Sequence, residues 1–363
     1  MPVAPVDDKG TVLFYEDTGA PEGLQSYTTA VFLHGDYFNG GIFQRLSPYA
    51  HLNGIRLVRL NSRDFTGSTP YSATEEALLS STERKDHETF FRDRAFEYTT
   101  FLQWFIQKEN IPPLAEDGRT GGISIVSWSS GSCQTIPLFA LADELPEELS
   151  EDLERFIRSL VLYECPYFPL GIPLPPHTDI YSPVSDSNLT NEQKGAGFAV
   201  WNSSYYTHSS TIISAFAASL QGFPSYKDLV AGLAKTPDQE PPFTISQISP
   251  EQLASISNPE GLLKSQLQIM LLDPNLKHEY TEKLLFGPRT VWRRATVEFV
   301  VNEKTMNYCI GAPWEVKRQL LERDRERQGK DVRPVNFTVL KGFNHYPHWD
   351  CPADFLKAIV HVL

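Results

Sequence analysis

The residues from Ile123 to Ser132 read Ile-Ser-Ile-Val-Ser-Trp-Ser-Ser-Gly-Ser, and this stretch decides the fold. A short apolar and β-branched run ends abruptly in small residues, and a long amphipathic segment from Cys133 to about Leu145 follows. This order predicts a buried strand, a sharp turn and a helix.

The turn has the form Ser-x-Ser-x-Gly around Ser129, close to the G-x-S-x-G sequence that presents a nucleophile between a strand and a helix. Small residues are needed two positions before and after the nucleophile, because the two backbones nearly touch there. Ser127 and Gly131 meet this need, whereas a nucleophile at Ser130 would put Trp128 in such a position. We therefore predict Ser129 as the nucleophile, with an ordinary helix cap as the alternative reading.

Length, charge and cysteine spacing exclude several classes of protein. The 363 residues suffice for one large domain with an insertion, or for two domains. The net charge of −13 and the absence of a basic block argue against nucleic acid as a partner. The four cysteines match no zinc or redox pattern, so we predict neither a metal nor another cofactor. Without a secretory signal or an apolar run long enough to span a bilayer, the sequence predicts a cytoplasmic protein with no membrane partner.

Apolar and β-branched runs alternate with segments of helical periodicity along most of the chain. Strands are predicted at 11–16, 28–33, 55–60, 123–128, 160–163, 295–301 and 335–340. Long helices are predicted at 87–110, at 313 to about 328, and at 352–363, and residues 69–86 read as an exposed polar excursion. Alternation of this kind predicts an α/β fold with a mainly parallel, doubly wound sheet.

The pattern changes after Pro166, where prolines are frequent and no convincing strand follows until about residue 295. We therefore divide the chain into a core of residues 1–165 and 291–363 and a helical insertion of residues 166–290. Ligands of such sheets bind at the carboxyl ends of the strands. The chemically informative residues directly follow predicted strands there: Asp36, Ser129, Glu164, Glu303 and His345.

The segment from Gly342 to Pro352 reads Gly-Phe-Asn-His-Tyr-Pro-His-Trp-Asp-Cys-Pro, and it resembles the loop after the last core strand of cap-bearing α/β-hydrolases. The turn at His34-Gly35-Asp36 and the loop from Arg63 to Ser68 resemble two further blocks of that superfamily. The resemblance implies an α/β-hydrolase core and a helical cap built from the insertion. It also implies that His345 is the catalytic base and that His348 is structural.

The same resemblance implies an oxyanion hole and a triad acid. The oxyanion donors would be the backbone N–H groups of Ser130 and Asp36, with Tyr37 as the alternative to Asp36. Many relatives carry the acid after the penultimate core strand, where this chain has Thr305 in place of the expected Asp. Glu164, at the end of the strand after the nucleophile helix, is the favoured acid, and Glu303 remains the alternative.

These residues predict a serine hydrolase that cleaves a carboxylic ester or a lactone through an acyl-enzyme. A lidded site suggests a medium-sized apolar small molecule as the substrate. Aromatic candidates for binding it are Trp128 beside the nucleophile and, in the cap, Trp201, Tyr205 and Tyr206. A lyase or C–C bond hydrolase with the same triad, or a non-catalytic ligand receptor, remain as alternatives, because a fold does not fix a reaction. The sequence gives no oligomeric state.

Overall fold

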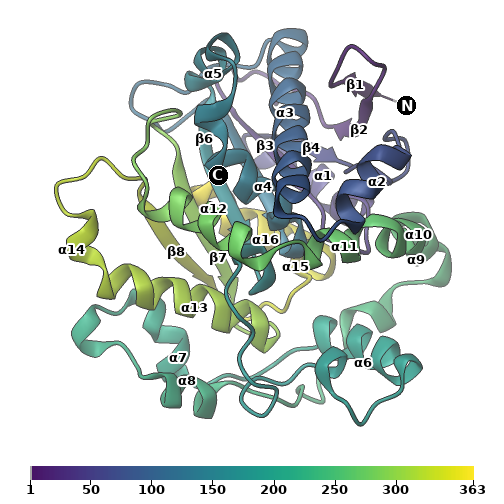
Figure 1. The fold of residues 1–363 in the computed structure, drawn as a ribbon, viewed down its shortest axis with the longest axis vertical. Coiled ribbons are helices and arrows are strands. Elements are labelled where there is room, and N and C mark those ends of the chain that lie inside the picture. The colour runs from purple at the N-terminus through teal and green to yellow at the C-terminus, as the bar shows by residue number, and fades with distance from the viewer. Residues whose placement is uncertain (1) are drawn as a thin grey trace.

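The computed structural model describes residues 2–363, and its centre is one eight-stranded sheet with the order β1-β2-β4-β3-β5-β6-β7-β8 (Figure 1). The first two strands pair antiparallel, β2 also runs antiparallel to β4, and the six strands from β4 to β8 are parallel. The predicted mainly parallel sheet is therefore confirmed. The strands are β1 (Val3–Pro5), β2 (Val12–Asp17), β3 (Thr28–Leu33), β4 (Ile55–Leu60), β5 (Ile123–Trp128), β6 (Ile157–Tyr163), β7 (Thr296–Asn302) and β8 (Val335–Leu340).

Helices cover both faces of the sheet, so the central strands are apolar on both sides. In β5 and β6, alternate residues enter two different cores: Ile125 and Leu160 face one, and Val126 and Val161 face the other. The first core is closed mainly by α3, α4, α12 and α13, and the second by α1 and α16. The α-helices of the core are α1 (Ser47–Ala50), α2 (Ala73–Ser80), α3 (Arg84–Glu109), α4 (Ser132–Ala140), α5 (Glu147–Glu154), α13 (Asn307–Glu322), α14 (Asp324–Arg327), α15 (Pro347–Asp350) and α16 (Pro352–Ile359).

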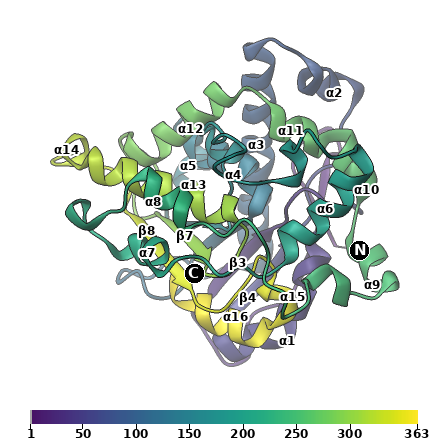
Figure 2. The same cartoon turned by 90° about the horizontal axis from the view of Figure 1, so that it is seen from below.

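The chain between β6 and β7 forms short helices and no named strand within the described residues. They are α6 (Asn191–Ser203), α7 (Ser210–Ser214), α8 (Tyr226–Gly232), α9 (Pro250–Ile256), α10 (Pro259–Gly261), α11 (Leu267–Leu271) and α12 (Pro274–Phe286). In Figure 1, α6, α7 and α8 lie below the sheet, and Figure 2 shows them from below, in front of it. The last helix of the insertion, α12, packs directly against α4 of the core.

The register of the parallel strands brings their carboxyl ends to one edge. Leu33 pairs with Ser127, and Ser127 pairs with Leu162, so β3, β5 and β6 end side by side. None of the helices formed by residues 2–363 combines the length and the apolar character needed to cross a bilayer. The residues that follow these strand ends form the candidate site.

Candidate active site

Ser129 directly follows β5 in a left-handed backbone conformation, with φ of 54°. One turn of 3-10 helix, Ser129–Gly131, leads into α4. A Cβ atom at Gly131 would lie 2.5 Å from the carbonyl oxygen of His34, so only glycine fits there. A left-handed backbone at a non-glycine residue such as Ser129 is uncommon, and it persists only where the surrounding structure holds the residue in place. The predicted strand, strained turn and helix are all present.

Ser127, which stands where the motif usually has glycine, is fully buried and bonded. Its hydroxyl accepts a hydrogen bond from Thr135 Oγ1 at 2.8 Å and lies 3.2 Å from Ser132 Oγ. The hydroxyl group is therefore paired inside the strand–helix junction, where an unpaired one would be costly. Serine in place of glycine at position 127 therefore adds no buried polar group without a hydrogen bond.

Glu164 and His345 form a buried hydrogen-bonded pair near the turn that carries Ser129. The distance between His345 Nδ1 and Glu164 Oε2 is 2.8 Å, and both side chains are almost completely shielded from solvent. Glu164 follows β6 with φ of 58°, so it too has a left-handed backbone. A carboxylate at Nδ1 fixes the imidazole tautomer that leaves Nε2 free to accept a proton.

Three further donors surround the Glu164 carboxylate and backbone. Asn302 donates its backbone N–H to Oε1 at 2.7 Å, the hydroxyl of Thr305 donates to Oε2, and the thiol of Cys309 donates to the Glu164 carbonyl at 3.1 Å. Burial raises the pKa of the Glu164 carboxyl, and the hydrogen bonds from His345, Thr305 and Asn302 oppose that rise. Thr305, which stands where the sequence resemblance expects an acid, thus donates to the carboxylate that follows the neighbouring strand. No motif around Thr305 signals this contact.

Glu303, the alternative acid, does not contact His345 in this structure. Its Oε2 accepts a hydrogen bond from the backbone N–H of Gly342 at 2.9 Å, and so it ties the β7 turn to the loop before His345. Of the two carboxylates weighed from the sequence, the structure brings only Glu164 to the histidine.

The turn after β3 packs against the turn that carries Ser129. A Cβ atom on Gly35 would lie 3.7 Å from Ser129 Cβ and 3.3 Å from Ser130 Oγ. His34 holds this turn: its Nδ1 contacts Gly35 O at 2.7 Å, and its Nε2 accepts the N–H of Ser62 at 3.1 Å. Burial lowers the pKa of His34 to about 4, so the ring is neutral.

Asp36 is only partly exposed, and its side chain faces polar groups of the site. Burial raises the pKa of its carboxyl, while the backbone N–H groups of Asp36 and Tyr37 and the charge of His345 act in the opposite direction. The Ser130 hydroxyl is buried without a hydrogen-bond partner among the described residues.

The four aromatic candidates occupy different places. Trp128 is buried, its ring lies 5.0 Å from that of His345, and its Nε1 donates to His345 O at 3.2 Å, so it supports the histidine loop from beneath. Trp201 and Tyr206 belong to a buried cluster that includes Cys309, next to the Glu164–His345 pair. Tyr205 donates its hydroxyl to Asp350 at 2.9 Å, where the insertion meets the core.

One group of side chains within residues 2–363 has the closeness that a metal ion needs. Glu164, Cys309 and His345 offer ligand atoms that all lie within 4.8 Å of one another. The hydrogen bond between Glu164 and His345 uses two of these ligands, and burial raises the pKa of the Cys309 thiol well above its ordinary value. Since metals bind the thiolate, these contacts favour a proton at this position over a metal ion.

The strand order, the strained serine turn after β5 and the histidine loop after β8 together define an α/β-hydrolase fold. No protein-family model and no curated protein matches the sequence. Among solved structures, the chain is similar to a mutant epoxide hydrolase of Vigna radiata, with 13% identity, a TM-score of 0.49, and coverage of 99% of this chain and 96% of that one.

Two other similar structures come from different branches of life. A crystal structure from work on carboxylesterases of the thaumarchaeon Nitrososphaera gargenis shares 11% identity, with a TM-score of 0.48 and coverage of 99% and 97%. The peroxisomal alpha-beta-hydrolase Lpx1 of Saccharomyces cerevisiae shares 11% identity, with a TM-score of 0.48 and coverage of 100% and 85%.

Proposed function

We propose that the protein is a serine hydrolase that cleaves a carboxylic ester or a lactone through an acyl-enzyme. Ser129 attacks the carbonyl carbon, His345 takes the serine proton and passes it to the leaving group, and Glu164 holds His345 in the required tautomer. Water then attacks the acyl-enzyme by the reverse proton transfers, and Ser129 is released.

The observation that most supports this proposal is the 2.8 Å hydrogen bond between His345 Nδ1 and Glu164 Oε2, which joins the loops after β8 and β6 across 181 residues. A buried carboxylate–imidazole pair beside a serine with a strained backbone is an arrangement typical of nucleophilic catalysis. The N–H groups of Ser130 and Asp36 are the proposed oxyanion donors. Preorganised donors of this kind contribute about 3–4 kcal/mol each to transition-state stabilisation.

The proposed substrate is a medium-sized, largely apolar small molecule. Trp201 and Tyr206 of the insertion and Met306 of the loop after β7 form a buried aromatic and thioether cluster, which supports an apolar substrate. The Nε1 group of Trp201, in the same cluster, is buried without a hydrogen-bond partner among residues 2–363.

A fluorophosphonate probe tests the proposal directly. The wild-type protein is expected to be labelled at Ser129, and Ser129→Ala is expected to lose the label while remaining folded. Ser130→Ala is the matched control, because it removes a neighbouring hydroxyl and keeps the backbone N–H. Wild-type protein that stays folded and unlabelled, or a label that persists in Ser129→Ala, would refute the nucleophile. Product analysis with p-nitrophenyl esters and simple lactones then separates hydrolysis from lyase chemistry.

A further inference from the structure

A short segment of the insertion is joined to the oxyanion loop by backbone hydrogen bonds. Phe38 and Ser257 form an isolated antiparallel β-bridge. Asn39 donates its N–H to Ile256 O at 2.8 Å, and Asn258 donates its N–H to Tyr37 O at 2.8 Å. The segment from Ser255 to Lys264, which we call the cap arm, therefore extends the loop that begins at Gly35.

Two asparagines reinforce this junction in reciprocal fashion. Asn39 accepts the N–H of Gly41 at 2.7 Å with Oδ1, and its Nδ2 donates across the junction to Ser255 O at 3.2 Å. Asn258 accepts the N–H of Gly261 at 3.2 Å with Oδ1, and its Nδ2 donates back across the junction to Asp64 O at 2.8 Å. Each amide thus caps a helix on its own side and holds a carbonyl on the other side.

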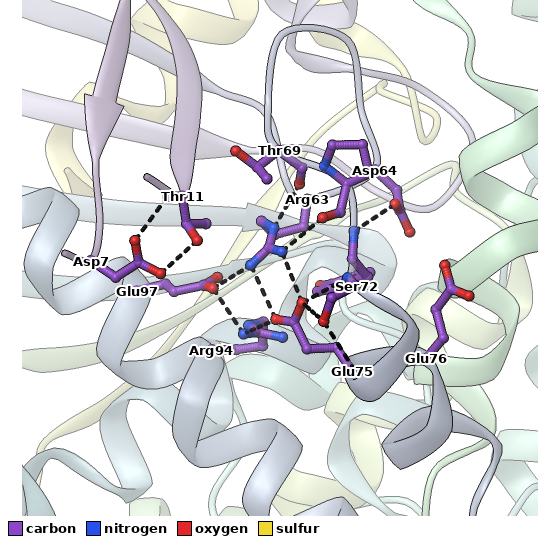
Figure 3. A network of polar contacts seen from close by, with 12 residues as sticks. Asp7, Thr11, Arg63, Asp64, Thr69, Ser72, Glu75, Glu76, Arg94 and Glu97 are labelled. Atoms are coloured by element: carbon purple, nitrogen blue, oxygen red, sulfur yellow. Dashed lines mark hydrogen bonds and ion pairs between the residues drawn. The ribbon is translucent and has the colours of Figure 1, made fainter. Parts of the chain in front are cut away.

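The core side of the junction is rigidly supported. Asp64 lies in the loop between β4 and α2, with φ of 66°, and its carboxylate pairs with Lys264 of the cap arm at 3.0 Å. The preceding residue, Arg63, points between Glu75 and Glu97 and donates to both, in a network that also contains Arg94 (Figure 3). Charged groups buried in such a network have little freedom to move, so the carbonyl that Asn258 holds is a fixed point.

The junction reaches the reacting groups through Phe38. Its ring packs against Trp128, with centroids 6.2 Å apart, and against Tyr346 at 5.9 Å. Ile256 of the cap arm is buried in the same cluster, and its Cγ2 would lie 3.1 Å from a Cβ on Gly41. A displacement of the cap arm would therefore shift the loop that carries the N–H groups of Asp36 and Tyr37.

We propose that Asn39 and Asn258 are positioning residues that use the cap arm to hold the oxyanion loop in its reactive geometry. This inference rests on the proposed hydrolase function, and it concerns the formation of the acyl-enzyme rather than the binding of the acyl chain. Oxyanion donors act only within a narrow range of distance, so a loop free to move loses transition-state stabilisation before it loses substrate affinity.

The test compares acylation in Asn39→Ser and Asn258→Ser with wild-type protein. Serine is a good helix cap, so each variant retains the local cap and loses the donor that reaches across the junction. The expected result is a roughly tenfold fall in kcat for p-nitrophenyl acetate and in the fluorophosphonate labelling rate, with KM nearly unchanged. A small acetate ester is used because a defect in the acyl-chain pocket alone would not affect it.

Ser225→Ala is the matched control, because Ser225 caps α8 in the distant part of the insertion. It is expected to lower the melting temperature without changing the labelling rate. Lys264→Met, at a half-exposed position of the same junction, provides a variant that folds if the asparagine variants do not, with an expected loss of roughly twofold.

The outcomes separate the two proposals. Unlabelled wild-type protein removes the proposed hydrolase function itself. If the wild-type protein is labelled and both asparagine variants react at the wild-type rate, the positioning role alone is overturned. If the asparagine variants do not fold, a wild-type rate in Lys264→Met overturns it. An equal loss of labelling in Ser225→Ala also overturns it, because the effect would then be a general consequence of a weakened cap.

Discussion

The substitution Glu164→Gln probes the acid of the proposed triad with the smallest change of shape. In the wild-type protein, Oε1 accepts the N–H of Asn302 at 2.7 Å, and Oε2 accepts from Thr305 and from His345 Nδ1 at 2.8 Å. The glutamine carbonyl takes the place of Oε1, so the NH2 group faces Nδ1. That group can only donate, and it therefore selects the imidazole tautomer with the proton on Nε2.

This tautomer cannot accept the proton of Ser129, and the imidazolium formed later lacks its counter-charge. We expect kcat to fall by about 10³- to 10⁴-fold, which corresponds to roughly 4–5.5 kcal/mol of lost transition-state stabilisation. The assay is pre-steady-state acylation by p-nitrophenyl acetate, with circular dichroism as the check of folding.

Glu303→Gln is the control for this experiment. Glu303 accepts one hydrogen bond, from the N–H of Gly342, and a glutamine carbonyl can accept it as well. Its activity should remain within about twofold of wild type. Folded Glu164→Gln protein with a tenth or more of the wild-type rate, or a hundredfold loss in Glu303→Gln, would refute the assignment of the acid.

Three further substitutions or conditions give measurable outcomes. Burial lowers the folded-state pKa of His34 to about 4, below its ordinary value of 6.5. Between these two pH values the unfolded chain binds more protons than the folded chain, so the folded protein loses stability as the pH falls through this window. Between pH 7 and pH 5 this loss amounts to about 2 kcal/mol in urea unfolding, and an equally steep pH dependence in His34→Gln would contradict its origin. Gly131→Ala places a Cβ 2.5 Å from His34 O, so a loss of about 1–3 kcal/mol in stability and of fluorophosphonate labelling is expected, and an unaffected variant would show that the turn relaxes. Arg63→Met leaves Arg94 as the one remaining buried arginine that pairs with Glu75 and Glu97 in this network. The free energy of unfolding is expected to fall by about 3 kcal/mol in thermal unfolding, and a fall below about 0.5 kcal/mol would show that Arg94 compensates.

The sheet was predictable because each buried strand is a β-branched, apolar run bounded by turn residues. The strand from Ile123 to Trp128 has the bounds expected from its sequence, and β8 likewise covers Val335–Leu340 as predicted. β1, at Val3–Pro5, was missed, since three residues at an edge carry almost no periodicity.

Two helix predictions went wrong for physical reasons. Residues 69–86 read as an exposed excursion, but they contain α2, whose capping box from Ser72 and Glu75 was present in the sequence as Ser-x-x-Glu. The helix predicted from Pro313 begins six residues earlier, at Asn307, and ends at Glu322. Proline is most common in the first turn of a helix, so Pro313 suggested a helix start at that residue. In the structure, Pro313 lies inside α13.

Some residues of the candidate site could be predicted from local motifs, whereas others are identified only by contacts between residues far apart in the sequence. Ser129 and His345 stand in local motifs, so the sequence alone supplied them as candidates. The contacts of Thr305 with Glu164 and of Asn258 with Asp64 join residues 141 and 194 positions apart. The first contact depends on the pairing of β6 with β7, and the second on how the insertion folds back onto the core; no local sequence pattern marks either of them.

The double attachment of the cap arm sets a boundary for exchanging caps between proteins of this fold. A chimera that replaces everything between Pro166 and Thr290 would also remove the strand-like pairing of Ser257 with Phe38. A replacement that ends before Ser255 keeps that pairing and the asparagine contacts. A recombination point that keeps the junction between Phe38 and Ser257 therefore lies inside the insertion, about ninety residues after it begins.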